Sequence, residues 1–268
     1  MGCCDSFTSD RKTSNMNIRH LKLVTFDVTN TLLTFRIAPG QYYANVGAQY
    51  GITCDGESIS QNFKTHFKYM TKEHPNFGLK SGLGWENWWR EVISKTFKDS
   101  NPLIKKEQLD ALSYKLIDDF KTSSCWIHCR GALDLLSYLK HKGIVLGVVS
   151  NFDPRLDITL RSAKIRHYFK FILSSYEFGV EKPNPEIFHE AMKLCEIKQL
   201  KCEECLHVGD SVALDFVGAK NAGWNGVIVN SKKDEDLPSK DYTFSSLYQF
   251  HKYFLDGTGD KLLVQSST

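Results

Sequence analysis

Short apolar runs alternate with longer amphipathic stretches over the second half of the chain, and one further apolar run lies near its start. The short runs are rich in β-branched and aromatic residues and end in turn formers, which is typical of buried strands in a parallel sheet. The predicted strands are residues 21–26, 144–149, 171–175, 205–209 and 225–229. The accompanying predicted helices are residues 131–142, 157–169, 186–195, 216–222 and 241–255. This alternation predicts an α/β protein with right-handed crossovers and one parallel sheet.

A different pattern occupies the chain between the first predicted strand and the second. Apolar residues recur there at helical spacing, and turn signals with glycine, proline or asparagine separate four such stretches. These predicted helices are residues 41–50, 58–72, 85–97 and 106–121. We predict that residues 37–125 form an all-helical insertion in a core made of residues 18–36 and 126–255. Residues 1–17 are predicted to be a disordered leader, and residues 256–268 a flexible tail.

The composition narrows the class of protein. Of the 268 residues, 41% are hydrophobic and 24% are charged, as in an ordinary soluble globular protein. The formal net charge of +3 is small for this length, so a nucleic-acid partner is not indicated. No run approaches the ~18 to 20 apolar residues that a membrane helix needs. The eight cysteines are irregularly spaced, which favours a reducing intracellular compartment, most simply the cytoplasm.

The leader carries a modification pattern. Met1-Gly2-Cys3-Cys4-Asp5-Ser6 matches the signal for myristoylation of Gly2, with Cys3 and Cys4 as candidate palmitoylation sites. The alternative is an unmodified leader rich in Ser, Thr and Asn. Membrane association is therefore expected only if the N-terminus is acylated.

Polar side chains follow several of the predicted strands at the points where they end. These residues are Asp27 after the first strand, Ser150 and Asn151 after the second, Lys182 after the third and a loop, and Asp210 with Asp215 after the fourth. Each one alone is explained by ordinary helix capping or a surface charge. Because the carboxyl ends of parallel strands face one edge of the sheet, we expect these residues to converge.

The converging residue types suit phosphate chemistry. Two carboxylates and main-chain carbonyls match Mg²⁺, which takes oxygen ligands and keeps several waters. A hydroxyl, a lysine and the N–H groups at a helix start suit a phosphoryl group. A carboxylate at Asp27 has the chemistry to attack phosphorus and form an aspartyl-phosphate that water then hydrolyses.

In sequence order, these residues resemble the four motifs of the haloacid dehalogenase superfamily of hydrolases. The matching segments are Asp27-Val-Thr29-Asn30-Thr31, Ser150-Asn151, Lys182-Pro183-Asn-Pro185, and Gly209-Asp210-Ser211 through Asp215. The resemblance implies a Rossmann-like core, with the helical insertion as a cap that closes over the site.

The resemblance also implies roles for the individual residues. Asp27 would be the nucleophile, and Mg²⁺ would be held by Asp27, the carbonyl of Thr29 and Asp210. Ser150, Asn151 and Lys182 would bind the phosphoryl group, and Lys182 would also be catalytic. Asp215 would support the metal and the lysine from behind. The implied partner is a small phosphorylated molecule.

The chain departs from the superfamily pattern at Thr29. Phosphatases of the superfamily carry a second Asp there, which protonates the leaving oxygen and later activates water. The metal site does not need that side chain, because the position contributes its backbone carbonyl. The missing acid–base group is typically worth about 10² to 10⁴-fold in rate. Thr at this position also resembles the Asp-Lys-Thr-Gly-Thr motif of P-type ATPases, and the superfamily's dehalogenases and phosphonatases likewise lack the second Asp.

Three functions remain open at this level. The first is a Mg²⁺-dependent hydrolase of a small phosphomonoester, slow because of Thr29. The second is a dehalogenase-type hydrolase, in which Asp27 attacks carbon without a metal. The third is a catalytically inactive binding protein that keeps the fold. Asp210 and Asp215 favour the metal-dependent route.

Other candidate features are weaker. Trp85, Trp88 and Trp89 on the third predicted helix suit either a pocket roof or a helix-bundle core, and we favour the core. The pairs Cys125 with Cys129 and Cys202 with Cys205 lack the spacing of a closed zinc site. His207 is interpreted as a satisfied core histidine. Asp153 and Arg155 suit either the site entrance or the start of a helix.

The leader pattern makes the first testable prediction. If Gly2 is acylated, the full-length protein is expected to partition to cell membranes, and Gly2→Ala to move it to the soluble fraction. Because firm anchoring needs a second chain, replacing Cys3 and Cys4 by Ser should weaken the association as well. Fractionation followed by immunoblotting measures the distribution, and identical behaviour of the three proteins would contradict acylation.

Overall fold

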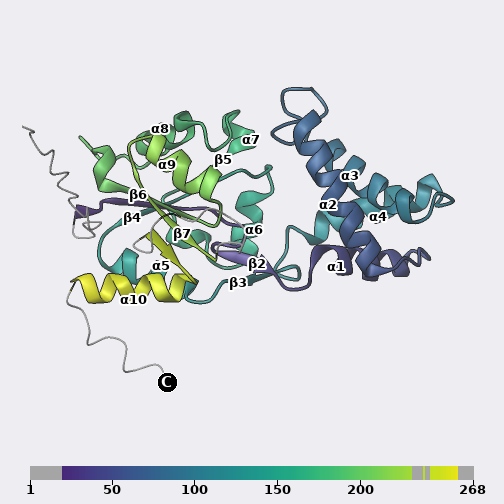
Figure 1. The fold of residues 1–268 in the computed structure, drawn as a ribbon, viewed down its shortest axis with the longest axis horizontal. Helices are drawn as coiled ribbons and strands as arrows, with labels where there is room; N and C mark the ends of the chain where they lie inside the picture. Colours follow the sequence, from purple (N-terminus) through teal and green to yellow (C-terminus); the bar gives the residue numbers. More distant parts are fainter. Residues whose placement is uncertain (1–19, 231–237, 239–241, 259–268) are drawn as a thin grey trace, which may run out of the picture.

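The computed structural model describes residues 20–230, 238 and 242–258, so the leader with Gly2, Cys3 and Cys4, and the tail from residue 259, lie outside the described residues. A six-stranded sheet has the order β5-β4-β1-β6-β7-β8, and every neighbouring pair is parallel (Figure 1). The strands are β1 (Leu23–Phe26), β4 (Val145–Ser150), β5 (Phe171–Ser174), β6 (Cys205–Gly209), β7 (Asn225–Val229) and β8 (Thr243–Phe244). The predicted parallel α/β fold is confirmed.

Helices cover both faces of this sheet (Figure 1). One face carries α5 (Ala132–His141), α6 (Leu156–Ser162) and α10 (Leu247–Thr258), and the other carries α8 (Pro185–Leu194) and α9 (Gly218–Asn221). Within β1, Val24 and Phe26 pack into the first layer and Leu23 into the second. Burial on both faces explains why the strands are continuous apolar runs rather than alternating ones.

The four predicted helices between the first two sheet strands are present as a separate bundle (Figure 1). They are α1 (Pro39–Gln49), α2 (Gly56–Glu73), α3 (Trp85–Ser100) and α4 (Lys106–Asp119), and we call them the helical insertion. Their shared apolar core includes Tyr43, Ile59, Phe97 and Leu112. No helix among the residues that the structure describes is long and apolar enough to cross a membrane.

A two-stranded antiparallel ribbon, which the sequence did not predict, carries the chain into and out of the helical insertion. It pairs β2 (Leu33–Phe35) with β3 (Trp126–His128). Each strand has three residues, which is too short for a period-2 pattern to be recognised. The ribbon is stabilised by aromatic packing of Phe35 on Trp126, with ring centroids 4.6 Å apart.

Three predicted helices differ from those observed. The helix expected at 157–169 ends at Ser162, because Lys164 has φ of 61° and a 3₁₀ helix (Arg166–Tyr168) follows. The segment expected to be helical at 216–222 contains the end of a π-helix (Val212–Val217) and the short α9. Near the start of the helix expected at 241–255, Thr243 and Phe244 instead form β8, and its pairing with β7 is a long-range contact that periodicity cannot show.

Side chains join the helical insertion to the core at two neighbouring points. At the first, Asn76 donates from Nδ2 to the carbonyl of Ser175 at 2.8 Å, and the Ser175 hydroxyl donates back to Asn76 Oδ1 at 2.8 Å. Ser175 begins the short helix α7 (Ser175–Phe178). At the second, Trp89 donates from Nε1 to Asp153 Oδ2 at 2.8 Å. These bonds set the helical insertion against the sheet edge.

The sheet makes a second testable prediction at Gly147, whose neighbour across β4 and β5 is Phe171. A Cβ at Gly147 would overlap the Phe171 ring. Gly147→Ala is therefore expected to lower the free energy of unfolding by about 1 to 3 kcal/mol, measured by urea denaturation. Adding Phe171→Leu should recover part of this loss, because the smaller side chain makes room. Unchanged stability of the single variant would show that the strands are not packed this way.

Candidate active site

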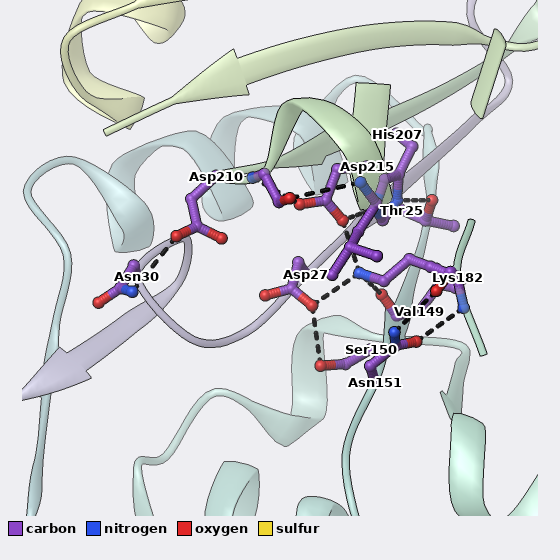
Figure 2. A network of polar contacts seen from close by, with 12 residues as sticks. Thr25, Asp27, Asn30, Val149, Ser150, Asn151, Lys182, His207, Asp210 and Asp215 are labelled. Carbon is purple, nitrogen blue, oxygen red and sulfur yellow. Dashed lines mark hydrogen bonds and ion pairs between the residues drawn. The ribbon is translucent and has the colours of Figure 1, made fainter. Parts of the chain in front are cut away.

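Asp27 lies immediately after the central strand β1, where its carboxylate is anchored on one side only. Its Oδ1 accepts hydrogen bonds from the Ser150 hydroxyl at 2.9 Å and from Lys182 Nζ at 2.7 Å. Among the described residues, no donor reaches Oδ2, and Figure 2 shows this oxygen turned toward the side of Asp210 and Asn30. Asp27 is 8% exposed. One oxygen is thus held while the other remains available for chemistry.

Lys182 is buried between two carboxylates (Figure 2). Its ammonium donates to Asp27 Oδ1 at 2.7 Å, to Asp215 Oδ1 at 2.6 Å and to the carbonyl of Val149 at 3.0 Å. All three N–H donors are therefore used. Burial works to lower the pKa of Lys182, but the charges of Asp215 and Asp27 outweigh it and raise the pKa. The lysine is a fixed cation at the sheet edge.

Asn151 holds the backbone of Lys182 rather than pointing its amide into open space. Its Oδ1 accepts from the Lys182 N–H at 2.8 Å, and its Nδ2 donates to the Lys182 carbonyl at 2.9 Å. This reciprocal pair ties the end of β4 to the loop after α7. The expected contact of Asn151 with phosphate stays a prediction, and the observed contacts show how Lys182 is positioned.

Asp215 is fixed by a chain of buried groups below the sheet edge. His207 Nε2 lies 3.0 Å from Asp215 Oδ1, and His207 Nδ1 lies 2.8 Å from the hydroxyl of Thr25. The backbone N–H of Ser211 donates to Asp215 Oδ2 at 2.9 Å. Gly209 leaves room for this carboxylate, because a Cβ there would overlap it. His207 is the satisfied core histidine that we predicted, and it also positions Asp215.

Burial and charge act in opposite directions on these two groups. Burial works to raise the pKa of Asp215, but the Lys182 ammonium and the His207 hydrogen bond outweigh it and hold the pKa below its usual range. Burial lowers the pKa of His207, and its hydrogen bond to Asp215 offsets only part of this effect. A neutral His207 donates from Nε2 to the carboxylate and accepts from Thr25 at Nδ1.

Asp210 faces the site with weaker support. Asn30 donates to its Oδ2 at 3.3 Å, and the carbonyl of Asn30 is held by Asn230 at 2.8 Å. Burial, followed by the charges of Asp27 and Asp215, raises the pKa of Asp210 to about 7. No local pattern in the sequence indicated these contacts of Asn30 and Asn230. Asn30 has φ of 58°, a conformation that Asn tolerates better than most residues.

The donor set fits Mg²⁺. Asp27 and Asp210 offer carboxylate oxygens, and Thr29, two residues after Asp27, offers its backbone carbonyl. No group of three or more Asp, Glu, His or Cys side chains within the described residues is arranged to hold a metal ion. Mg²⁺ commonly uses only one or two carboxylates and completes its coordination with other oxygens and water. A dication would also offset the negative charge that acts on Asp210.

A cavity of about 420 Å³ lies between the core and the helical insertion, and it reaches the site at Thr29 and Asn151. Aromatic side chains make up half of its lining. They include Phe35, Trp126 and Phe152 from the core, and Phe63, Phe67 and Trp89 from the helical insertion. Trp88 and Trp89 therefore fit different interpretations. Trp88 is 1% exposed and belongs to a small apolar core cluster, whereas Trp89 lines the cavity.

Asp153 and Arg155 also line the cavity, and Arg155 is the N-cap residue of α6 as well. Both are buried, at 1% and 6% exposure. Arg155 donates to Asp153 through Nε at 2.9 Å and Nη2 at 2.6 Å, and through Nη1 to the carbonyl of Ile117 at 3.1 Å. Its guanidinium also lies 5.1 Å from the ring centroid of Trp89.

Comparison with known proteins defines the class. The model of the family described as haloacid dehalogenase-like hydrolase matches residues 21–223. The chain is 42% identical over 255 residues to the Rhythmically expressed gene 2 protein of Drosophila melanogaster, across 90% of this chain and 98% of that protein. It is 34% identical over 222 residues to Haloacid dehalogenase-like hydrolase domain-containing protein 3 of Bos taurus, across 82% and 86% of the two chains. The chain belongs to the haloacid dehalogenase-like hydrolase family.

Solved structures share the fold. The magnesium-bound HAD-hydrolase YfnB of Bacillus subtilis matches with a TM-score of 0.68 and 20% identity, over 87% of this chain and 98% of that one. A 2-haloacid dehalogenase of Pseudomonas syringae matches with a TM-score of 0.58 and 22% identity, over 88% and 98%. At this identity the comparison concerns the fold alone, and it includes a dehalogenase.

The buried lysine makes a third testable prediction. Lys182→Met leaves two buried carboxylates without their cation, so the free energy of unfolding is expected to fall by about 3 to 5 kcal/mol in urea denaturation. Lys193→Met is the matched control, because its side chain is 74% exposed and forms an ion pair with Glu190 on the same helix. The control should change stability by less than about 0.5 kcal/mol. Equal free energies of unfolding for the two variants would show that the buried ion network does not contribute to stability as expected.

Proposed function

We propose that this protein is a Mg²⁺-dependent hydrolase of a small phosphomonoester that works through a phosphorylated Asp27. The observation that carries the proposal is the half-anchored carboxylate of Asp27. Ser150 and Lys182 bind Oδ1, and Oδ2 accepts no hydrogen bond from the described residues. A nucleophile needs this combination of a fixed orientation and one uncommitted oxygen.

The reaction has two steps. In the first, an oxygen of Asp27 forms a bond to phosphorus while the bond between phosphorus and the ester oxygen breaks. The leaving oxygen keeps the electron pair and takes a proton from solvent. In the second, water attacks phosphorus, the bond to the Asp27 oxygen breaks, and phosphate is released. The proton of the attacking water passes to solvent.

The surrounding residues support both steps. Lys182 places a positive charge on Oδ1 of the reacting carboxylate, and Asp215 and His207 keep that charge in place. Mg²⁺ bound by Asp27, Asp210 and the Thr29 carbonyl would supply positive charge against the phosphoryl oxygens. The related YfnB is described as bound to magnesium, which supports the assignment of this ion. The helical insertion would act as the cap that covers the site.

Thr29 limits this chemistry to favourable leaving groups. Without an acid at this position, the ester oxygen departs as an anion, so its own stability sets the rate of the first step. Aryl phosphates and acyl phosphates are therefore better substrates than sugar phosphates. The second step also lacks a base, so the phosphorylated Asp27 should accumulate.

A dehalogenase-type reaction is the second candidate, because Thr29 lacks the acid–base carboxylate and a 2-haloacid dehalogenase shares the fold. In that reaction Asp27 attacks carbon and needs no metal. Asp210 favours the phosphatase, because it brings a second carboxylate to the sheet edge beside Asp27, where a divalent cation would offset the charge of both. A chain that catalyses neither reaction would be a binding protein that keeps the site.

The Thr29 departure makes a fourth testable prediction. With 4-nitrophenyl phosphate, turnover should require Mg²⁺, and Asp27→Asn should abolish both turnover and phosphorylation of the protein. Thr29→Asp should raise kcat by on the order of 10²-fold, because it restores the missing acid–base group. Steady-state kinetics and intact-protein mass spectrometry measure these effects.

Thr53→Asp is the control, since Thr53 is exposed in the loop before α2 and the same substitution there should leave kcat unchanged. Metal-independent release of chloride from a 2-chloroacid would favour the dehalogenase. Absence of both activities, with no labelling of Asp27, would favour the binding protein.

A further inference from the structure

The cavity beside the site has a definite size. An apolar cavity of about 150 Å³ accommodates a benzene ring. The cavity of about 420 Å³ in this chain therefore has room for one or two fused rings beyond the position of the phosphoryl group. A two- or three-carbon haloacid would leave most of this space empty.

Three of the polar residues on the cavity wall, Asp153, Arg155 and Asn151, are committed to partners within the protein, and Thr29, Tyr43 and Lys64 complete the polar lining. Both oxygens of Asp153 accept from Arg155, and its Oδ2 also accepts from Trp89. The Arg155 guanidinium is shared between Asp153, the carbonyl of Ile117 and the faces of Trp85 and Trp89. The side-chain amide of Asn151 is taken by the backbone of Lys182.

These commitments decide what kind of substrate fits. A sugar would bring several hydroxyl groups into a space whose lining is half aromatic and where Asp153, Arg155 and Asn151 are already paired within the protein, and each unpaired hydroxyl loses its hydration. An aromatic group would instead contact rings such as Phe63, Phe67 and Trp89. Aromatic rings gain both from burial and from favourable ring geometry.

The absence of an acid at Thr29 independently favours an aromatic leaving group. A phenol loses its proton near pH 10, as the tyrosine side chain does, whereas an aliphatic alcohol holds its proton far more tightly. A phenolate therefore departs from phosphorus without an acid from the protein. The lining of the cavity and the missing acid both favour the same leaving group.

We propose that the substrate class is the phosphate monoesters of aromatic alcohols, with the aromatic group held between the core and the helical insertion. This inference rests on the proposed phosphatase function and specifies its substrate. Phe35, Trp126 and Phe152 form the core side of the aromatic site, and Phe63, Phe67 and Trp89 form the opposite side.

A substrate series tests the proposal with the unaltered protein and Mg²⁺. Phenyl phosphate and 2-naphthyl phosphate have similar leaving groups but differ by one ring. The larger ester should have about tenfold higher kcat/KM, through a lower KM, because it buries more apolar surface. Glucose 6-phosphate should be at least 10²-fold poorer than phenyl phosphate. Acetyl phosphate, which needs no acid and has no ring, reports the phosphatase chemistry separately.

A matched pair of variants locates the effect. Phe67 lines the cavity and packs against Trp89, with ring centroids 5.9 Å apart, whereas Tyr69 on the same helix is 51% exposed. Phe67→Asn should reduce the naphthyl-to-phenyl ratio of kcat/KM from about ten to near one. Tyr69→Asn should keep the ratio of the unaltered protein. Phe67→Leu serves if the asparagine variant does not fold, and should give an intermediate ratio.

The outcomes separate this inference from the proposed function. Hydrolysis of acetyl phosphate, with equal kcat/KM for naphthyl, phenyl and sugar esters, would overturn the aromatic substrate class and leave the phosphatase standing. If no phosphate compound is hydrolysed, isothermal titration calorimetry of the Asp27→Asn variant still tests the aromatic site, because it measures the affinity for each ester without turnover. Tenfold tighter binding of 2-naphthyl phosphate than of phenyl phosphate would then support the aromatic site while the phosphatase fails, and equal binding would overturn both.

Discussion

The site depends on one buried cation held between two carboxylates. Removing Lys182, Asp27 and Asp215 from water costs several kcal/mol for each ion, and only close contacts and complete hydrogen bonding offset that cost. The structure meets this condition, because every N–H of the ammonium has an acceptor and each carboxylate has further donors. A network satisfied in this way permits one arrangement of the charges. The orientation of Asp27 follows from that arrangement.

The elements around the network can be understood as its supports. Asn151 holds the backbone on either side of the Lys182 side chain, and His207 holds Asp215 from inside the sheet. Gly209 is required because the Asp215 carboxylate lies where a Cβ would be. Asp27, Ser150 and Asp215 come together at the ends of β1, β4 and β6, which are neighbours in the sheet but distant in sequence. A parallel sheet brings their carboxyl ends to one edge, and this geometry places charged groups there at low conformational cost.

Charged and apolar functions are separated in space. The sheet edge carries the carboxylates and the lysine, while the helical insertion contributes mainly aromatic and aliphatic side chains to the cavity. The charged pair of Asp153 and Arg155 lies at the boundary and is neutralised internally. In the proposed mechanism, the phosphoryl chemistry and the recognition of the leaving group therefore use different residues. Substitution in the cavity would then change the preferred substrate without altering the charges at the sheet edge.

The sequence alone determined the parallel α/β fold, the helical insertion and the convergence of Asp27, Ser150, Lys182 and Asp210. These follow from local periodicity and from the rule that parallel strands end at one edge. Only the tertiary structure decided which groups pair. The contacts of Asn30 with Asp210, 180 residues apart, and of Trp89 with Asp153, 64 residues apart, leave no trace in local sequence patterns. The ribbon of β2 and β3 and the aromatic cavity were missed for the same reason, because packing between distant segments creates them.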